Sequence, residues 1–125
     1  MEEDKACFRV DNFHKVPPSI RLVFLTHFHA DHYSGIAETL AARDDITVLC
    51  TEITRSLVLS KLHVPQKQIQ SLQMCEPRFI TEPLVTSEDE TFTVTALPAN
   101  HCPGSAAFLF EFGNGPRWLH TGDFR

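Results

Sequence analysis

A buried strand that runs straight into a histidine-rich loop constrains this 125-residue chain more than any other feature. Ile20 to Leu25 is an almost continuous apolar run, with Arg21 as the exception, which is typical of a strand covered on both faces. Residues 26–32, with the sequence THFHADH, follow at once. Ser34 to Arg43 then has the apolar spacing of a helix. The sequence therefore predicts a strand, a polar loop and a helix that packs back on a sheet.

The rest of the first half continues to alternate strands with helices. We expect strands at Phe8–Val10 and Ile46–Cys50. Thr51 can cap the next helix, because a threonine hydroxyl accepts a hydrogen bond from a backbone N–H of the first turn. The predicted apolar face of this helix contains Ile53, Leu57 and Leu62, and Pro65 is expected to end it.

The second half changes to hairpins. Thr91 to Leu97 alternates apolar and polar residues, which predicts a strand with one buried face. Ala106 to Phe112 is apolar except for Glu111, and Arg117 to Thr121 returns after a Gly-Asn-Gly turn signal. Together the two halves predict an α/β fold with a mixed β-sheet flanked by helices.

Composition places the chain among ordinary soluble globular domains, with 42% hydrophobic and 22% charged residues. No apolar run approaches the roughly 20 residues that a membrane helix needs, so we expect no membrane association. The four cysteines lie far apart without a Cys-x-x-Cys pair, which favours free thiols in an intracellular, reducing compartment.

The net charge of −5 sets a condition on any nucleic-acid partner. Proteins that bind nucleic acid are usually basic, because contacts to phosphate dominate their affinity. Either the partner is not nucleic acid, or the basic groove lies in sequence outside this chain.

The histidine-rich loop has the residue types of a metal site. Three histidines and one carboxylate fall within six residues, and imidazole and carboxylate are ligands that Zn²⁺ favours. His27 and His29 are two apart, so both can point at one ion in an extended segment. Asp31 and His32 follow where the chain turns into a helix. A solvent-facing polar loop is the alternative, but four such residues directly after a buried strand favour the metal site.

Two further segments at predicted strand ends carry single candidate ligands. Residues 100–105 (NHCPGS) contain His101, and residues 121–125 (TGDFR) contain Asp123. Each alone is typical of a turn. A fold that gathers strand ends on one edge would bring all three segments into one site.

The order of these ligands resembles that of metallo-β-lactamase-fold hydrolases. The flanking residues 25–35 (LTHFHADHYSG), 100–105 and 119–125 (LHTGDFR) resemble the DNA cross-link repair nucleases. Residues 51–64 (TEITRSLVLSKLHV) resemble the subgroup of 5′ exonucleases in that family. The resemblance extends from about Phe8 to the last residue.

This resemblance implies the amino-terminal half of an αββα metallo-β-lactamase fold. Residues 1–125 would form a partial domain, without the β-CASP region and the carboxy-terminal half. The implied cofactor is one or two Zn²⁺ ions, with Mg²⁺ as an alternative. The implied ligands are His27, His29, Asp31, His32, His101 and Asp123.

The resemblance also assigns roles to these residues. His27, His29 and His101 would hold the first ion, and Asp31 and His32 the second. Asp123 would bridge the two ions, and it would be catalytic together with Asp31 and His32. Asp11 matches the first motif of the family, an aspartate at a strand end, and would hold one ligand imidazole in a single tautomer.

The implied activity is a nuclear 5′-to-3′ DNA exonuclease that repairs interstrand cross-links and double-strand breaks. Its substrate would be DNA with 5′-phosphorylated or damaged ends, and the 125 residues alone would have little activity. Three alternatives remain open: an RNA-cleaving β-CASP endonuclease of pre-mRNA 3′-end processing, a small-molecule metallo-hydrolase, and a non-catalytic fragment.

Overall fold

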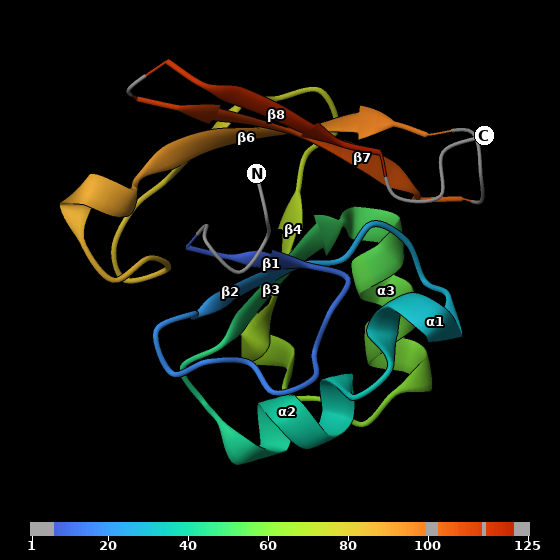
Figure 1. Cartoon of the computed structure of the whole chain (residues 1–125). Helices are drawn as coiled ribbons and strands as arrows, with labels where there is room; N and C mark the ends of the chain where they lie inside the picture. The colour runs from blue at the N-terminus through green and yellow to red at the C-terminus, as the bar shows by residue number, and fades with distance from the viewer. Residues whose placement is uncertain (1–6, 100–102, 114, 122–125) are drawn as a thin grey trace.

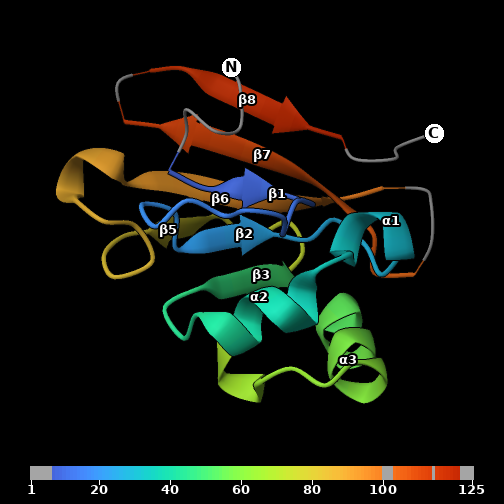
Figure 2. The same cartoon turned by 60° about the horizontal axis from the view of Figure 1, so that its bottom comes forward.

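The computed structural model describes residues 7–99, 103–113 and 115–121. These residues form two four-stranded sheets that face each other, with helices on the outer side of the first sheet (Figures 1 and 2). The predicted α/β fold class is confirmed. The parallel and antiparallel strands do not share one mixed sheet, however. They form separate sheets. Helices join the last three strands of the first sheet, a loop joins its first two, and the strands of the second half are joined without an α-helix.

The first sheet has the order β1-β2-β3-β4, and all its strands are parallel. Its strands are β1 Arg9–Val10, β2 Leu22–Phe24, β3 Thr47–Thr51 and β4 Ile69–Leu72. The connecting helices are α1 Ala30–Tyr33, α2 Ile36–Ala42, α3 Glu52–Lys61 and the short 3-10 helix η2 Gln66–Gln68. Because parallel strands end at the same edge of a sheet, the loops after β1, β2 and β3 lie near one another.

The second sheet has the order β5-β6-β7-β8, and all its strands are antiparallel. Its strands are β5 Arg78–Ile80, β6 Phe92–Pro98, β7 Ala106–Phe112 and β8 Arg117–His120, with the 3-10 helix η3 Glu88–Glu90 before β6. The predicted alternation in β6 is confirmed, since Phe92, Val94 and Ala96 are all buried. Sequence periodicity did not predict β4 and β5, which are short and mix polar with apolar residues.

Phenylalanine side chains fill the space between the two sheets. The Phe8 ring stacks on that of Phe110 at a centroid distance of 4.4 Å, and Phe24 lies 5.2 Å from Phe108. All four side chains are fully buried. Burial of one such side chain stabilises the fold by roughly 1.5–3 kcal/mol, so this aromatic layer holds the sheets together.

A second core lies between the first sheet and its helices. Val58 of α3 and Ile36 and Leu40 of α2 pack there. The predicted apolar face of α3 is wrong in part, because Ile53 is 51% exposed and the buried residues of the helix are Thr54 and Val58. The helix also ends at Lys61, four residues before the proline that was expected to end it, because Leu62 adopts an extended backbone.

Two segments join the sheets through the backbone. The Ala106 N–H at the start of β7 donates to the Thr26 carbonyl oxygen after β2, at 2.8 Å. Cys75, between β4 and β5, donates its N–H to the carbonyl oxygen of Ala96 in β6, at 2.7 Å. The first of these bonds lies directly beside the histidine-rich loop and fixes that loop against the second sheet.

Candidate metal site

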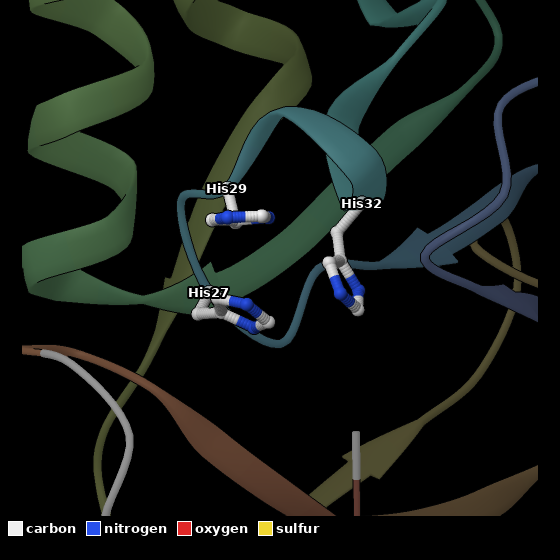
Figure 3. Close-up of side chains that lie close together, drawn as sticks. All are labelled: His27, His29 and His32. Atoms are coloured by element: carbon white, nitrogen blue, oxygen red, sulfur yellow. The ribbon is translucent and has the colours of Figure 1, made fainter. Parts of the chain in front are cut away.

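Three of the predicted ligands come together where β2 ends and α1 begins. Figure 3 shows the rings of His27, His29 and His32 gathered around one space. One ring nitrogen from each lies within 4.8 Å of the others, a spacing at which three imidazoles can bind one ion. We call these three residues the histidine cluster.

The local backbone explains why these positions converge. His29 is the N-cap of α1 and has extended angles, with φ −141° and ψ 139°. Residues 27–28 before it form a bend, in which the His29 N–H donates to the His27 carbonyl oxygen at 3.1 Å, so the segment is not the extended stretch that the sequence suggested. The chain then turns into the helix, where the His32 N–H donates to the His29 carbonyl oxygen at 2.9 Å. One helical turn thus returns His32 to the side of the other two rings.

Asp11 supports the cluster from the end of β1. Its backbone lies in the left-handed region at φ 55°, and its N–H donates to the Phe24 carbonyl oxygen at 2.8 Å. The carboxylate Oδ1 accepts the Thr26 N–H at 2.8 Å, and Oδ2 accepts the Thr26 hydroxyl at 2.7 Å. The same Oδ2 lies 2.7 Å from His32 Nδ1. Only 8% of the Asp11 side chain is exposed, so these contacts are shielded from water.

The contact with Asp11 sets the proton position on His32. An ionised carboxylate can only accept hydrogen bonds, so Nδ1 of His32 carries the proton and donates it. In the neutral ring the lone pair then lies on Nε2. Carboxylates hold metal-binding histidines in this way in many metal sites, and the arrangement raises the basicity of the free nitrogen.

The histidine cluster fits a divalent metal that prefers nitrogen ligands. Its side chains run from the protein interior to the surface: His27 is 1% exposed, while the side chains of His32 and His29 are 15% and 53% exposed. An ion can therefore reach the cluster from solvent and lose part of its water shell there. Neutral imidazoles suit zinc and related transition metals better than they suit Mg²⁺.

Of the other three predicted ligands, Asp31 lies among the described residues. The Asp31 side chain is 84% exposed, and its Oδ2 lies 3.8 Å from His29 Nδ1. The His32 ring centroid is 4.2 Å from that of His27, closer than the His29 centroid at 5.7 Å. His32 thus lies beside His27 in the histidine cluster. His101 and Asp123 lie outside the described residues.

The described residues on either side of position 101 are held by hydrogen bonds. The Ser105 hydroxyl donates to the Ala99 carbonyl oxygen at 2.6 Å. The hydroxyls of Thr51 and Thr54, at the start of α3, lie 2.6 and 3.2 Å from the Gly104 carbonyl oxygen. The sequence predicted Thr51 as the helix cap, which the Thr54 N–H contact confirms, but not this second contact.

Sequence reasoning also gave no role to Thr26, which lies between Asp11 and His27. Its hydroxyl is 2.8 Å from His27 Nδ1 as well as 2.7 Å from Asp11 Oδ2. A threonine before a histidine is common in sequences. Its importance appears only when parallel pairing of β1 with β2 brings Asp11 beside it.

The described cysteines are free thiols, as expected. Burial raises the pKa of the Cys50 thiol to about 12. Burial, with a contribution from the nearby Glu90 charge, also raises the pKa of Cys7 to about 12. Because a thiol must lose its proton to bind a metal well, neither cysteine is suited to ligation near neutral pH.

Comparison with known proteins shows the superfamily of this chain. A family described as "Beta-lactamase superfamily domain" matches residues 5–125. The chain belongs to this superfamily. The metallo-beta-lactamase fold protein YhfI from Bacillus subtilis superposes with a TM-score of 0.60 at 20% identity, over 83% of this chain and 41% of that one. That likeness shows the shared fold.

Sequence relatives narrow the group. The chain is 41% identical over 119 residues to the human DNA cross-link repair 1A protein, covering 94% of this chain and 10% of the relative. It is 44% identical over 107 residues to the mouse 5′ exonuclease Apollo, covering 86% of this chain and 18% of the relative. The resemblance to the DNA cross-link repair group is therefore confirmed. The chain spans only a tenth to a fifth of the length of these two relatives.

The helices also bear on whether the chain could cross a membrane. In the part of the chain that the structure describes, none combines the length and apolar character needed to cross a membrane.

Proposed function

We propose that this chain forms the metal-binding part of a metal-dependent phosphodiester hydrolase that cleaves DNA. The histidine cluster with its Asp11 support carries the proposal, because it provides oriented nitrogen ligands at a solvent-accessible strand edge. The names of the relatives, DNA cross-link repair 1A protein and 5′ exonuclease Apollo, support DNA as the substrate.

The proposed ligand set is His27, His29, Asp31, His32, His101 and Asp123. A bound divalent ion, zinc in the first place and Mg²⁺ as the alternative, would lower the pKa of a bound water and so supply hydroxide near neutral pH. Asp31 is exposed and close to His29, so its carboxylate can move to orient that water or accept its proton. His32 and Asp123 complete the proposed catalytic group.

The finer assignment follows the relatives. We propose 5′-to-3′ digestion of DNA with 5′-phosphorylated or damaged ends, in the nucleus, during repair of interstrand cross-links and double-strand breaks. Residues 1–125 form a partial metallo-β-lactamase-like domain, with the β-CASP region and the remaining half supplied by other residues of the protein. Because the chain carries a net charge of −5, those other residues must also supply the basic DNA-binding surface.

The test compares the full-length natural protein that contains this chain with two variants at the site, Asp31→Asn and His32→Ala. His63→Ala is the matched control, because His63 is an exposed histidine outside the site. Each protein receives zinc and equal lengths of 5′-phosphorylated single-stranded DNA, 5′-hydroxyl DNA and RNA, and a β-lactam as small-molecule substrate. Thermal melting is measured alongside.

We expect both site variants to melt like the parent but to lose DNA cleavage, while His63→Ala keeps it. The 125-residue chain alone should show little cleavage. Faster cleavage of RNA than of DNA would favour the 3′-end processing alternative, and turnover of the β-lactam alone would favour a small-molecule hydrolase. Parental DNA cleavage by either site variant would remove its residue from the catalytic group.

A further inference from the structure

We infer that Thr26 is a positioning residue whose hydroxyl forms a hydrogen-bond relay between the Asp11 carboxylate and the His27 ring. One carboxylate would then orient two of the metal-binding imidazoles, His32 directly and His27 through Thr26. This inference deepens the proposed function and rests on the metal-binding role proposed there.

The first step is that Thr26 cannot move freely. Thr26 is only 1% exposed, and both its backbone N–H and its carbonyl oxygen form hydrogen bonds. The N–H donates to Asp11 Oδ1 at 2.8 Å, and the carbonyl oxygen accepts the Ala106 N–H at 2.8 Å. The hydroxyl is therefore held in a fixed place between the carboxylate and the imidazole, 2.7 Å from one and 2.8 Å from the other.

The second step counts protons. A threonine hydroxyl has one proton to donate and two lone pairs to accept with. The Asp11 carboxylate can only accept, so the hydroxyl proton is directed to Oδ2. In its 2.8 Å contact with His27 Nδ1 the hydroxyl oxygen can then only accept, so Nδ1 must carry a proton and donate it. His27 is thereby fixed as the Nδ1–H tautomer, with its lone pair on Nε2.

The third step joins the two histidines. Oδ2 of Asp11 accepts from the Thr26 hydroxyl and from His32 Nδ1, both at 2.7 Å. The same oxygen thus sets the proton position on both rings, whose centroids are 4.2 Å apart. Both rings then offer Nε2 as the ligand atom, and neither tautomer has to change before an ion binds.

Substitutions at Thr26 separate this role from simple packing. Thr26→Val keeps the branched shape but removes the hydroxyl, so the Nδ1–H of His27 and Asp11 lose their common partner. Thr26→Ser keeps the hydroxyl and loses only a methyl group. Thr95→Val is the matched control, because Thr95 is a buried threonine in β6, 7% exposed.

The experiment uses the 125-residue chain without metal, labelled with ¹⁵N at histidine, at a pH above the ordinary histidine pKa of about 6.5. Two-bond ¹⁵N–¹H spectra give the tautomer of each ring. We expect His27 to be Nδ1–H in the parent, in Thr26→Ser and in Thr95→Val, and to shift toward the Nε2–H form in Thr26→Val. Competition with a chromophoric chelator then measures zinc affinity, which Thr26→Val should lower about 10- to 100-fold.

Each outcome supports or overturns the relay. An Nε2–H tautomer of His27 in the parent overturns it without any variant, so a valine variant that fails to fold does not protect the idea. An unchanged tautomer in folded Thr26→Val also overturns it. If the tautomers behave as expected but the parent binds no zinc, the relay stands and the proposed metal-dependent function fails.

Discussion

At the scale of single residues, the site depends on an aspartate in an unusual backbone conformation. Asp11 has φ 55°, in the left-handed region that Asp and Asn adopt more readily than other residues with a side chain. Its N–H is fixed by Phe24, which directs the carboxylate toward Thr26 and His32. The short side chain places its two oxygens within 2.8 Å of both partners.

We predict that Asp11→Asn weakens zinc binding about 10- to 100-fold, the usual effect of losing a carboxylate behind a ligand histidine. An amide has one oxygen in place of two and no charge, so if its oxygen keeps the place of Oδ2 its NH2 group meets the Thr26 N–H, a donor against a donor. The thermal midpoint should change little by comparison. Chelator competition measures the affinity, with His63→Ala as the control, and parental zinc affinity in Asp11→Asn would contradict the prediction.

Cysteine reactivity provides a second prediction. Burial holds the pKa of Cys50 at about 12, whereas Cys75 is exposed. Since the thiolate is the reactive form, we expect iodoacetamide at pH 8 to modify Cys75 rapidly and Cys50 only after unfolding. Peptide mass spectrometry at timed intervals, with and without denaturant, checks this. Equal rates at both cysteines in the folded chain would show that Cys50 is accessible.

The residues of the site could be predicted from the sequence only where their chemistry is concentrated. His27, His29 and His32 share one short segment, so their convergence follows from local geometry. Asp11 lies 15 residues from Thr26 in the chain, and only the register of β1 with β2 brings the two together. The family resemblance pointed to Asp11, but nothing in the sequence singled out Thr26.

At the scale of elements, the predicted helices and strands agree best with the structure where one interaction dominates. The bounds of β7 match the prediction, because its apolar run is long and ends at clear turn signals. The apolar face of α3 was misassigned because packing, rather than hydrophobic spacing, sets its rotation. Thr54 is buried where its hydroxyl reaches the Gly104 carbonyl, and this leaves Ile53 half exposed.

We predict that Gly104→Ala destabilises the chain and lowers its metal affinity. Gly104 has φ +83°, and an added Cβ would lie 2.8 Å from the Ile53 Cβ and 3.1 Å from the Thr54 backbone nitrogen. Relief would require the loop or the start of α3 to move. We expect a loss of about 1–3 kcal/mol, typical of a strained backbone position.

Chemical denaturation measures that loss, with Gly113→Ala as the control, because an added Cβ at Gly113 meets nothing within 4 Å. Similar midpoints for the two alanine variants would show that the contact between Gly104 and α3 is not restrictive.

At the scale of the whole molecule, the two sheets differ in how their outer faces are covered. Helices α2 and α3 cover the outer face of the first sheet (Figure 2). On the second sheet, Phe79 and Leu119 are 64% and 51% exposed. Exposed apolar side chains on a sheet favour association between molecules in solution.

We therefore predict that Leu119→Lys improves the solubility of the 125-residue chain with little change in its stability. The contrasting variant is Phe24→Ala, which removes a fully buried ring between the sheets and should cost about 3–5 kcal/mol. Light scattering and thermal melting of both variants check the two expectations. A large loss of stability in Leu119→Lys would mean that the side chain is packed in solution.

The hydrogen bond from Ala106 to Thr26 has a consequence for how the site could be followed over time. It crosses from one sheet to the other beside the histidines, so its amide proton can exchange with deuterium only when the sheets separate at that edge. The Leu25 amide, which bonds to Leu49 within the first sheet, exchanges by a different opening. The ratio of these two exchange rates would therefore report how often the sheets separate at the metal-binding edge. A ligand that bridges the sheets should slow exchange of the Ala106 amide more than exchange of the Leu25 amide.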